Sequence, residues 1–175
     1  MRYTLRQYGR GIRQSSAYGL GPGIAPGLRS SLADLSSPGD VPAKRQIALE
    51  VIEQLQYEPH LRGKVFLQPV AWDKPGAGTV MRATITPQEA IDRGLPKPAK
   101  CDIVVVIFWA RMGTPLPNPP YHKANGEPYY SGAEWEYENA LESASQHKRP
   151  EVVVYRRMEK VLLDPGAADF KERVE

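Results

Sequence analysis

The run Ile-Val-Val-Val-Ile-Phe at 103–108 is the feature that most limits how this chain can fold. All of its side chains are apolar, and none alternates with a polar one. A strand of this kind needs cover on both faces, which is typical of the centre of a parallel sheet flanked by helices. We therefore expect a buried strand over 101–109 in a chain of 175 residues, a length that suits one domain.

Helical and strand patterns alternate on either side of this run. Asp40 is a favourable helix N-cap, and Ile47, Val51 and Leu55 then recur every four residues, which predicts a helix ending near 57–59. The other expected elements are a strand at 64–72 with Pro69 indicating a sheet edge, a helix from the capping box at 86–89 to Gly94, a helix from the capping box at 131–134 to about His147, a strand at 152–155 and a closing helix at about 167–174.

This order of elements predicts an α/β fold with a mainly parallel sheet. A strand should precede Ser36, yet residues 28–35 read Leu-Arg-Ser-Ser-Leu-Ala-Asp-Leu and are poor in apolar side chains. Ordered structure is therefore expected to begin near Ser36. The expected sheet also lacks a last strand, because the sequence stops after the closing helix.

Charge is distributed unevenly along the chain. The net charge is +3, but residues 1–33 hold five of the 23 Lys and Arg residues and none of the 20 acidic residues. We expect residues 1–30 to form a flexible Gly- and Arg-rich arm and residues 31–175 to form the folded domain. The arm is either a disordered leader or a contact for nucleic acid, and its few aromatic residues make nucleic-acid binding the weaker hypothesis.

Several classes of protein are excluded by composition. No apolar run approaches the roughly 18 residues of a membrane span, and no secretory signal is visible, so a cytoplasmic location is expected. Cys101 is the single cysteine, and the three histidines are scattered, so no metal site is expected.

Candidate site residues lie where the carboxyl ends of the predicted strands should meet, since ligands bind at that edge of an open α/β sheet. The segments 36–40, 73–79 and 109–131 should converge there, and the last includes a proline-rich loop. Each candidate could equally pack at the rim or carry a surface charge. The candidate substrate-binding residues are Ser37, Asp40, Trp72, Asp73, Trp109 and Ser131.

Three glutamates follow this loop at 134, 136 and 138. Acidic residues favour the first turn of a helix through the macrodipole, and Glu134 occupies the capping-box position. Glu138 is expected to be solvated. Glu136 is flanked by the small residues Ala133 and Ala140, which leaves room for a ligand above its carboxylate.

Two segments carry a resemblance to a known family: Ser-Ser-Pro-Gly-Asp at 36–40 and Ser-Gly-Ala-Glu-Trp-Glu-Tyr-Glu at 131–138. Residues 36–173 resemble the TIR-like domains at the amino end of bacterial STAND-type signalling ATPases of the NACHT kind. The resemblance implies a flavodoxin-like three-layer fold. It also implies that Glu136, in the spacing Glu-x-x-x-Ala, serves cleavage of NAD. The family's usual tryptophan lies four residues before the glutamate, whereas Trp135 adjoins it.

The resemblance leaves two functions open. One is an enzyme of signalling or defence that hydrolyses NAD, with NAD as substrate and no further cofactor. The other is a module without chemistry that self-associates or binds a STAND-type ATPase.

Overall fold

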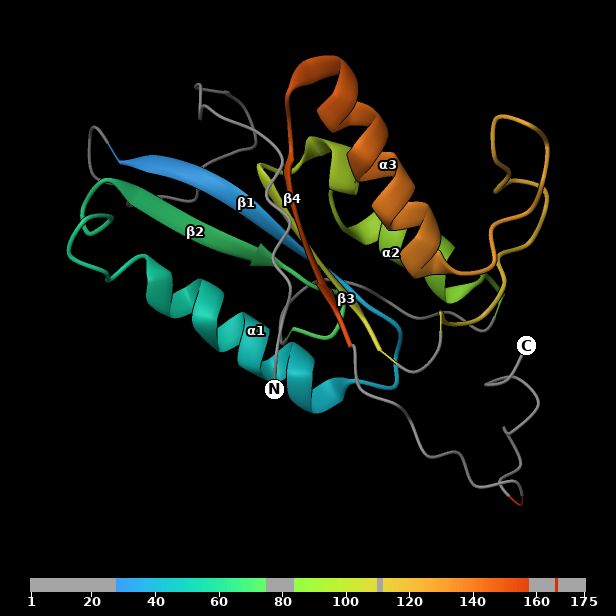
Figure 1. Cartoon of the computed structure of the whole chain (residues 1–175), viewed down its shortest axis with the longest axis horizontal. Helices are drawn as coiled ribbons and strands as arrows, with labels where there is room; N and C mark the ends of the chain where they lie inside the picture. The colour runs from blue at the N-terminus through green and yellow to red at the C-terminus, as the bar shows by residue number, and fades with distance from the viewer. Residues whose placement is uncertain (1–27, 75–83, 110–111, 158–165, 167–175) are drawn as a thin grey trace.

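The computed structural model describes residues 28–74, 84–109, 112–157 and 166 (Figure 1). Its elements in chain order are β1 (Arg29–Ser36), α1 (Pro42–Leu55), β2 (Val65–Val70), α2 (Pro87–Gly94), the 3-10 turn η1 (Pro98–Lys100), β3 (Ile103–Phe108), α3 (Gly132–His147) and β4 (Glu151–Arg156). Most of the predicted arm (residues 1–27), the predicted closing helix and the loop segment 75–79 fall outside these described residues. The last residues of the predicted arm, Arg29 and Ser30, belong to β1.

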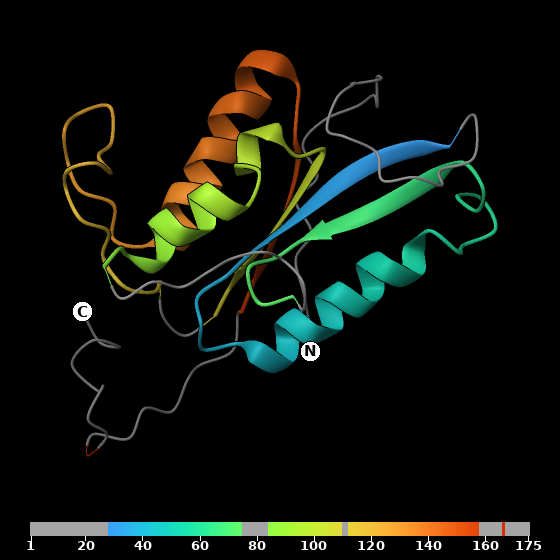
Figure 2. The same cartoon turned by 180° about the vertical axis from the view of Figure 1, so that it is seen from behind.

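The four strands form one parallel sheet in the order β2-β1-β3-β4. Helix α1 covers one face of the sheet, and α2 and α3 cover the other, as Figures 1 and 2 show from opposite sides. The predicted α/β fold, compatible with a flavodoxin-like arrangement of three layers, is confirmed. The position of β3 between two neighbours and the edge position of β2 are confirmed as well.

The expectation that ordered structure begins near Ser36 is wrong, because β1 begins at Arg29. This strand pairs with β2 on one side and β3 on the other, so its backbone is satisfied despite its polar sequence. Ala33 and Leu35 pack into the apolar clusters on the α1 side. The intervening residues Asp34 and Ser36 face α3, since side chains alternate along a strand.

The start of α1 differs from the prediction. Its N-cap is Val41 rather than Asp40, and no side chain caps it. Pro42 occupies the first helical position, where its fixed φ suits the helix and its missing N–H is not needed. The backbone carbonyl of Val41 then accepts from the N–H groups of Lys44 and Arg45.

The apolar stripe predicted for α1 is only partly turned inward. Ile47 and Val51 are 53% and 48% exposed, whereas Leu49 and Ile52 are buried against the sheet. The helix itself is confirmed. The face of the helix that packs on the sheet is therefore centred on Leu49 and Ile52 rather than on Ile47 and Val51.

The two capping boxes have different outcomes. In α2, Thr86 and Glu89 form the complete reciprocal box. In α3, the Ser131 hydroxyl accepts from the Glu134 N–H, but the Glu134 carboxylate binds the Tyr130 N–H and Lys123. Both helices end where predicted, at Gly94 and His147. None of the helices in the described segments is both long and apolar enough to span a membrane.

Candidate functional site

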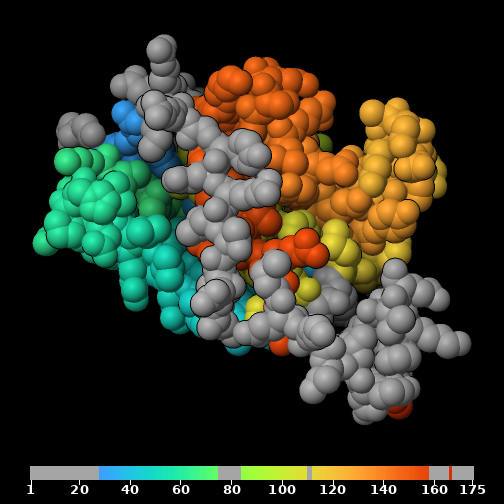
Figure 3. Space-filling view, viewed as in Figure 1, coloured from blue at the N-terminus to red at the C-terminus, as the bar shows by residue number. Residues whose placement is uncertain are grey.

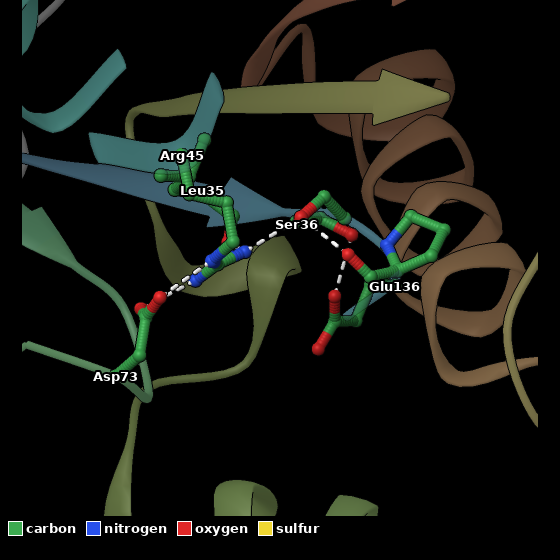
Figure 4. A network of polar contacts seen from close by, with 7 residues as sticks. Leu35, Ser36, Arg45, Asp73 and Glu136 are labelled. Atoms are coloured by element: carbon green, nitrogen blue, oxygen red, sulfur yellow. Dashed lines mark hydrogen bonds and ion pairs between the residues drawn. The ribbon is translucent and has the colours of Figure 1, made fainter. Parts of the chain in front are cut away.

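Glu136 lies at the carboxyl end of β1, where the sequence placed a ligand site. Its Oε2 atom accepts a 2.5 Å hydrogen bond from the Ser36 hydroxyl, the last residue of β1 (Figure 4). Its Oε1 atom accepts a 3.2 Å bond from Nε2 of Gln88 on α2. Ser36 and Gln88 are both buried, whereas Glu136 is half-buried. Three elements, β1, α2 and α3, thus meet at one carboxylate.

A second carboxyl group lies close to Glu136. Asp34 precedes Ser36 by two residues on the same face of β1 and is only 8% exposed. Its Oδ2 atom is buried and has no hydrogen-bond partner among the described residues. Burial, followed by repulsion from Glu136, raises the pKa of Asp34 well above its ordinary value. Two carboxyl groups therefore share this interior, and the charged form of each disfavours that of the other.

The pKa of Glu136 is raised as well, chiefly by burial. The hydrogen bonds from Ser36 and Gln88 oppose this rise, because they favour the charged form. These two donors therefore limit the rise in the pKa of Glu136 that burial causes.

Arg45 of α1 organises the opposite side of the β1 terminus. Its guanidinium forms two bonds with the carboxylate of Asp73, at 2.7 and 2.6 Å. It also donates to the Leu35 carbonyl at 3.1 Å and the Ser37 hydroxyl at 2.8 Å. Figure 4 shows the paired bonds to Asp73. The ring of Trp72 lies 5.4 Å from the guanidinium carbon. Hydrogen bonding from Arg45 lowers the pKa of Asp73.

Arg45 therefore accounts for three of the predicted substrate-binding residues. Ser37, Trp72 and Asp73 do converge, as the sequence predicted. They converge on a buried arginine, however, and this gives Ser37 and Asp73 a stabilising role in the fold.

The remaining three candidates lie in different settings. Ser131 is fully buried, and its hydroxyl caps α3. Trp109 packs on the α1 side of the sheet, where the cations of Lys44 and Arg157 lie 5.4 and 4.6 Å from its ring. Asp40 has a buried Oδ1 atom without a partner in the described parts of the chain. Of the six, none has a contact that links it directly to Glu136 in the way Ser36 and Gln88 do.

Sequence reasoning missed Asp34, Ser36, Arg45 and Gln88 as site residues. Asp34 offered a signal, because a lone acidic residue in a central strand needs a polar partner or a raised pKa. Gln88 offered none, since it lies within a capping box that already explains its neighbours.

Within the described residues, no group of three or more His, Cys, Asp or Glu side chains could hold a metal ion. No family model, curated protein or solved structure matches this chain.

Proposed function

We propose that this protein is a TIR-like signalling or defence module that hydrolyses the N-glycosidic bond of NAD through Glu136. The observation that carries the proposal is the half-buried Glu136 carboxylate, held by Ser36 and Gln88 at the carboxyl end of a parallel sheet. That edge is where α/β sheets bind ligands. The family resemblance supports the choice of NAD among such ligands.

The chemistry requires a negative charge near the ribose. When the bond between ribose C1′ and the nicotinamide nitrogen breaks, its electron pair leaves with nicotinamide, and positive charge develops on the sugar. A fixed carboxylate stabilises that charge. Water then adds to C1′ and loses a proton to solvent, which gives ADP-ribose, nicotinamide and H⁺.

Glu136 suits this role because its environment is arranged in advance. Burial strengthens its interaction with a developing positive charge, and the donors from Ser36 and Gln88 fix both of its oxygen atoms. Asp34 adds a second carboxyl group behind it. No rearrangement of the carboxylate is needed when the charge appears.

The test compares NAD consumption by the wild type, Glu136→Gln and Glu138→Gln, with assembly promoted by high concentration and a crowding agent. Glu138 is the matched control, since it lies on the same helix but its side chain is 42% exposed beside Lys123. We expect Glu136→Gln to lose activity at least about a hundredfold and Glu138→Gln to retain it. Full turnover by Glu136→Gln, or no turnover by folded wild type under any condition, would exclude the proposal.

A second function is favoured by a different observation. Ile47, Val51 and Leu55 of α1 are partly exposed and border a hollow of about 450 Å³ that is floored by Val105 and Val153 of the sheet. An exposed apolar surface of this kind is typical of a contact site, here with a second copy of the chain. The resemblance adds a STAND-type ATPase as a further expected partner.

Sedimentation of Val51→Lys beside Leu141→Lys tests this alternative. Leu141 is a comparably exposed leucine on α3, at 39%. We expect the wild type and Leu141→Lys to associate at high concentration and Val51→Lys to stay monomeric. A wild type that is monomeric throughout would remove the basis for self-association through α1.

A further inference from the structure

Gln88 connects Glu136 to the proline-rich loop. Its Nε2 atom donates to Glu136 at 3.2 Å and also to Oδ1 of Asp92 at 3.0 Å. The other oxygen of Asp92 accepts a 2.9 Å bond from the Tyr121 hydroxyl, within the loop that projects beside α3 in Figure 3. A continuous series of hydrogen bonds thus runs from Tyr121 to Glu136.

The orientation of the Gln88 amide follows from its partners. An ionised carboxylate can accept hydrogen bonds but cannot donate them, so the NH₂ group of Gln88 must face Asp92 and Glu136. The amide oxygen then points toward the first residue of α3, Gly132. A Cβ atom at position 132 would lie 2.2 Å from this oxygen and 3.3 Å from the amide carbon.

The Gln88 side chain therefore leaves no room for a Cβ atom at position 132, which explains the glycine there. Its backbone does not adopt the positive φ that would demand glycine, and alanine is the better helix former. What alanine would displace is the end of the Gln88 side chain. Since Gln88 is only 5% exposed, its amide has little other room in which to settle.

Tyr121 is itself held firmly. Its ring makes an edge-to-face contact with Trp135, with centroids 5.6 Å apart. Burial, together with the hydrogen bond to Asp92, raises the pKa of the Tyr121 hydroxyl, so the hydroxyl stays a donor. Asp92 is fixed by this donor and in turn fixes Gln88.

We infer that Gln88 is a positioning residue for Glu136, seated in a slot that exists because residue 132 is glycine and held there by Asp92 and Tyr121. Its amide fixes the Oε1 atom of Glu136 and favours the ionised form of that carboxyl. The expected effect on catalysis rests on the proposed function. The expected effect of Gln88 on the pKa of Glu136 is independent of that function.

The decisive variant is Gly132→Ala in the full chain. The only atoms that must move belong to the flexible end of Gln88, so the fold should survive. We expect the pKa of Glu136, followed by NMR of ¹³C-labelled glutamate, to rise in Gly132→Ala and in Gln88→Met, which has similar volume but no donor. In an active preparation, kcat should fall about tenfold with little change in KM, as expected for loss of one hydrogen bond to a charged group.

Two controls separate positioning from general damage. Gly39→Ala is the matched glycine variant, because a Cβ there meets nothing within 4 Å, and it should leave the titration of Glu136 unchanged. The double variant Gly132→Ala/Gln88→Met should shift the titration no further than Gln88→Met alone, since Gly132 acts through Gln88.

The outcomes distinguish this inference from the proposed function. If Gln88→Met leaves the titration of Glu136 in place, or if the double variant shows two additive shifts, the role of Gln88 or of Gly132 is wrong, whatever the activity. If the titration shifts as expected but no variant and no wild type consumes NAD, the positioning role stands and the proposed hydrolysis fails.

Discussion

The two sides of the β1 terminus treat buried charge in opposite ways. On the α1 side, the guanidinium of Arg45 is fully enclosed and matched by the carboxylate of Asp73 with two short bonds. On the α3 side, Asp34 and Glu136 place two carboxyl groups together, where Ser36 and Gln88 donate neutral hydrogen bonds to Glu136 and the charge of Arg45 acts without direct contact. The ion pair is matched by direct contact, whereas burial of the two carboxyl groups outweighs the favourable interactions around them and raises their pKa values.

This difference separates a matched ion pair from two carboxyl groups whose charged forms burial disfavours. A buried ion pair that satisfies its own hydrogen bonds has nothing left to offer a ligand. A pair of carboxyl groups with raised pKa values and an unpartnered oxygen costs stability, and such costs are typical of functional sites. The comparison therefore supports the proposed site on the α3 side and gives Arg45 and Asp73 on the α1 side a structural role.

Removal of Asp73 should produce the largest loss of stability. In Asp73→Ala the buried Arg45 charge has no carboxylate partner, so we expect the free energy of unfolding to fall by about 3 kcal/mol. Urea denaturation of the variant and the wild type measures this difference in the free energy of unfolding. Glu53→Ala, which removes an exposed pair with Lys74, should cost less than about 1 kcal/mol. Equal losses in both variants would abolish the distinction between the two sides.

Asp34→Asn should have the opposite sign. The amide removes a charge that burial and Glu136 both disfavour, and its NH₂ group is a new donor within this interior. We expect stabilisation on the order of 1 kcal/mol at neutral pH, measured by the same denaturation. A marked destabilisation would show that the Asp34 carboxylate is compensated after all.

The pH dependence of stability should differ in sign between the two aspartates. The folded chain holds the Asp34 proton to a higher pH than the unfolded chain does, so the stabilising effect of Asp34→Asn should appear as pH rises above the ordinary value of 3.8. The pKa of Asp73 is lowered, so its contribution is complete above 3.8 and is lost as pH falls below it. Thermal unfolding of each Asn variant beside wild type from pH 3 to 7 tests both trends.

The sequence predicted the layers of the fold more fully than the site. The continuous apolar run of β3 and the helix signals at Thr86 and Ser131 are local, and the structure retains each of them. The strand β1 was underestimated because its stability comes from pairing on both sides and from polar contacts to α3, neither of which its own residues reveal.

The sequence indicated the candidate site residue that lies in a local pattern. It did not indicate the residues that contact this one from other segments of the chain. Glu136 was predicted from the small residues that flank it, its place after the loop and the family resemblance, which implied its spacing to Ala140. Its partners Ser36 and Gln88 lie 100 and 48 residues away in the chain, so no local pattern links them to it. Arg45 was missed for the same reason, since its partner Asp73 is 28 residues distant.

The smallest change in stability is expected at Ser131. The sequence predicted that this residue binds substrate, whereas the structure shows its hydroxyl as the N-cap of α3. The structure makes its hydroxyl the cap of α3, so Ser131→Ala should lower the free energy of unfolding by about 1 kcal/mol and leave the KM of the proposed NAD hydrolysis unchanged below the melting temperature. Ser145→Ala, at an exposed position of the same helix, should leave stability almost unaltered. If Ser131→Ala instead raised KM with no loss of stability, the hydroxyl would bind substrate, as the sequence alone suggested, and the carboxyl end of the sheet would extend its ligand site to the start of α3.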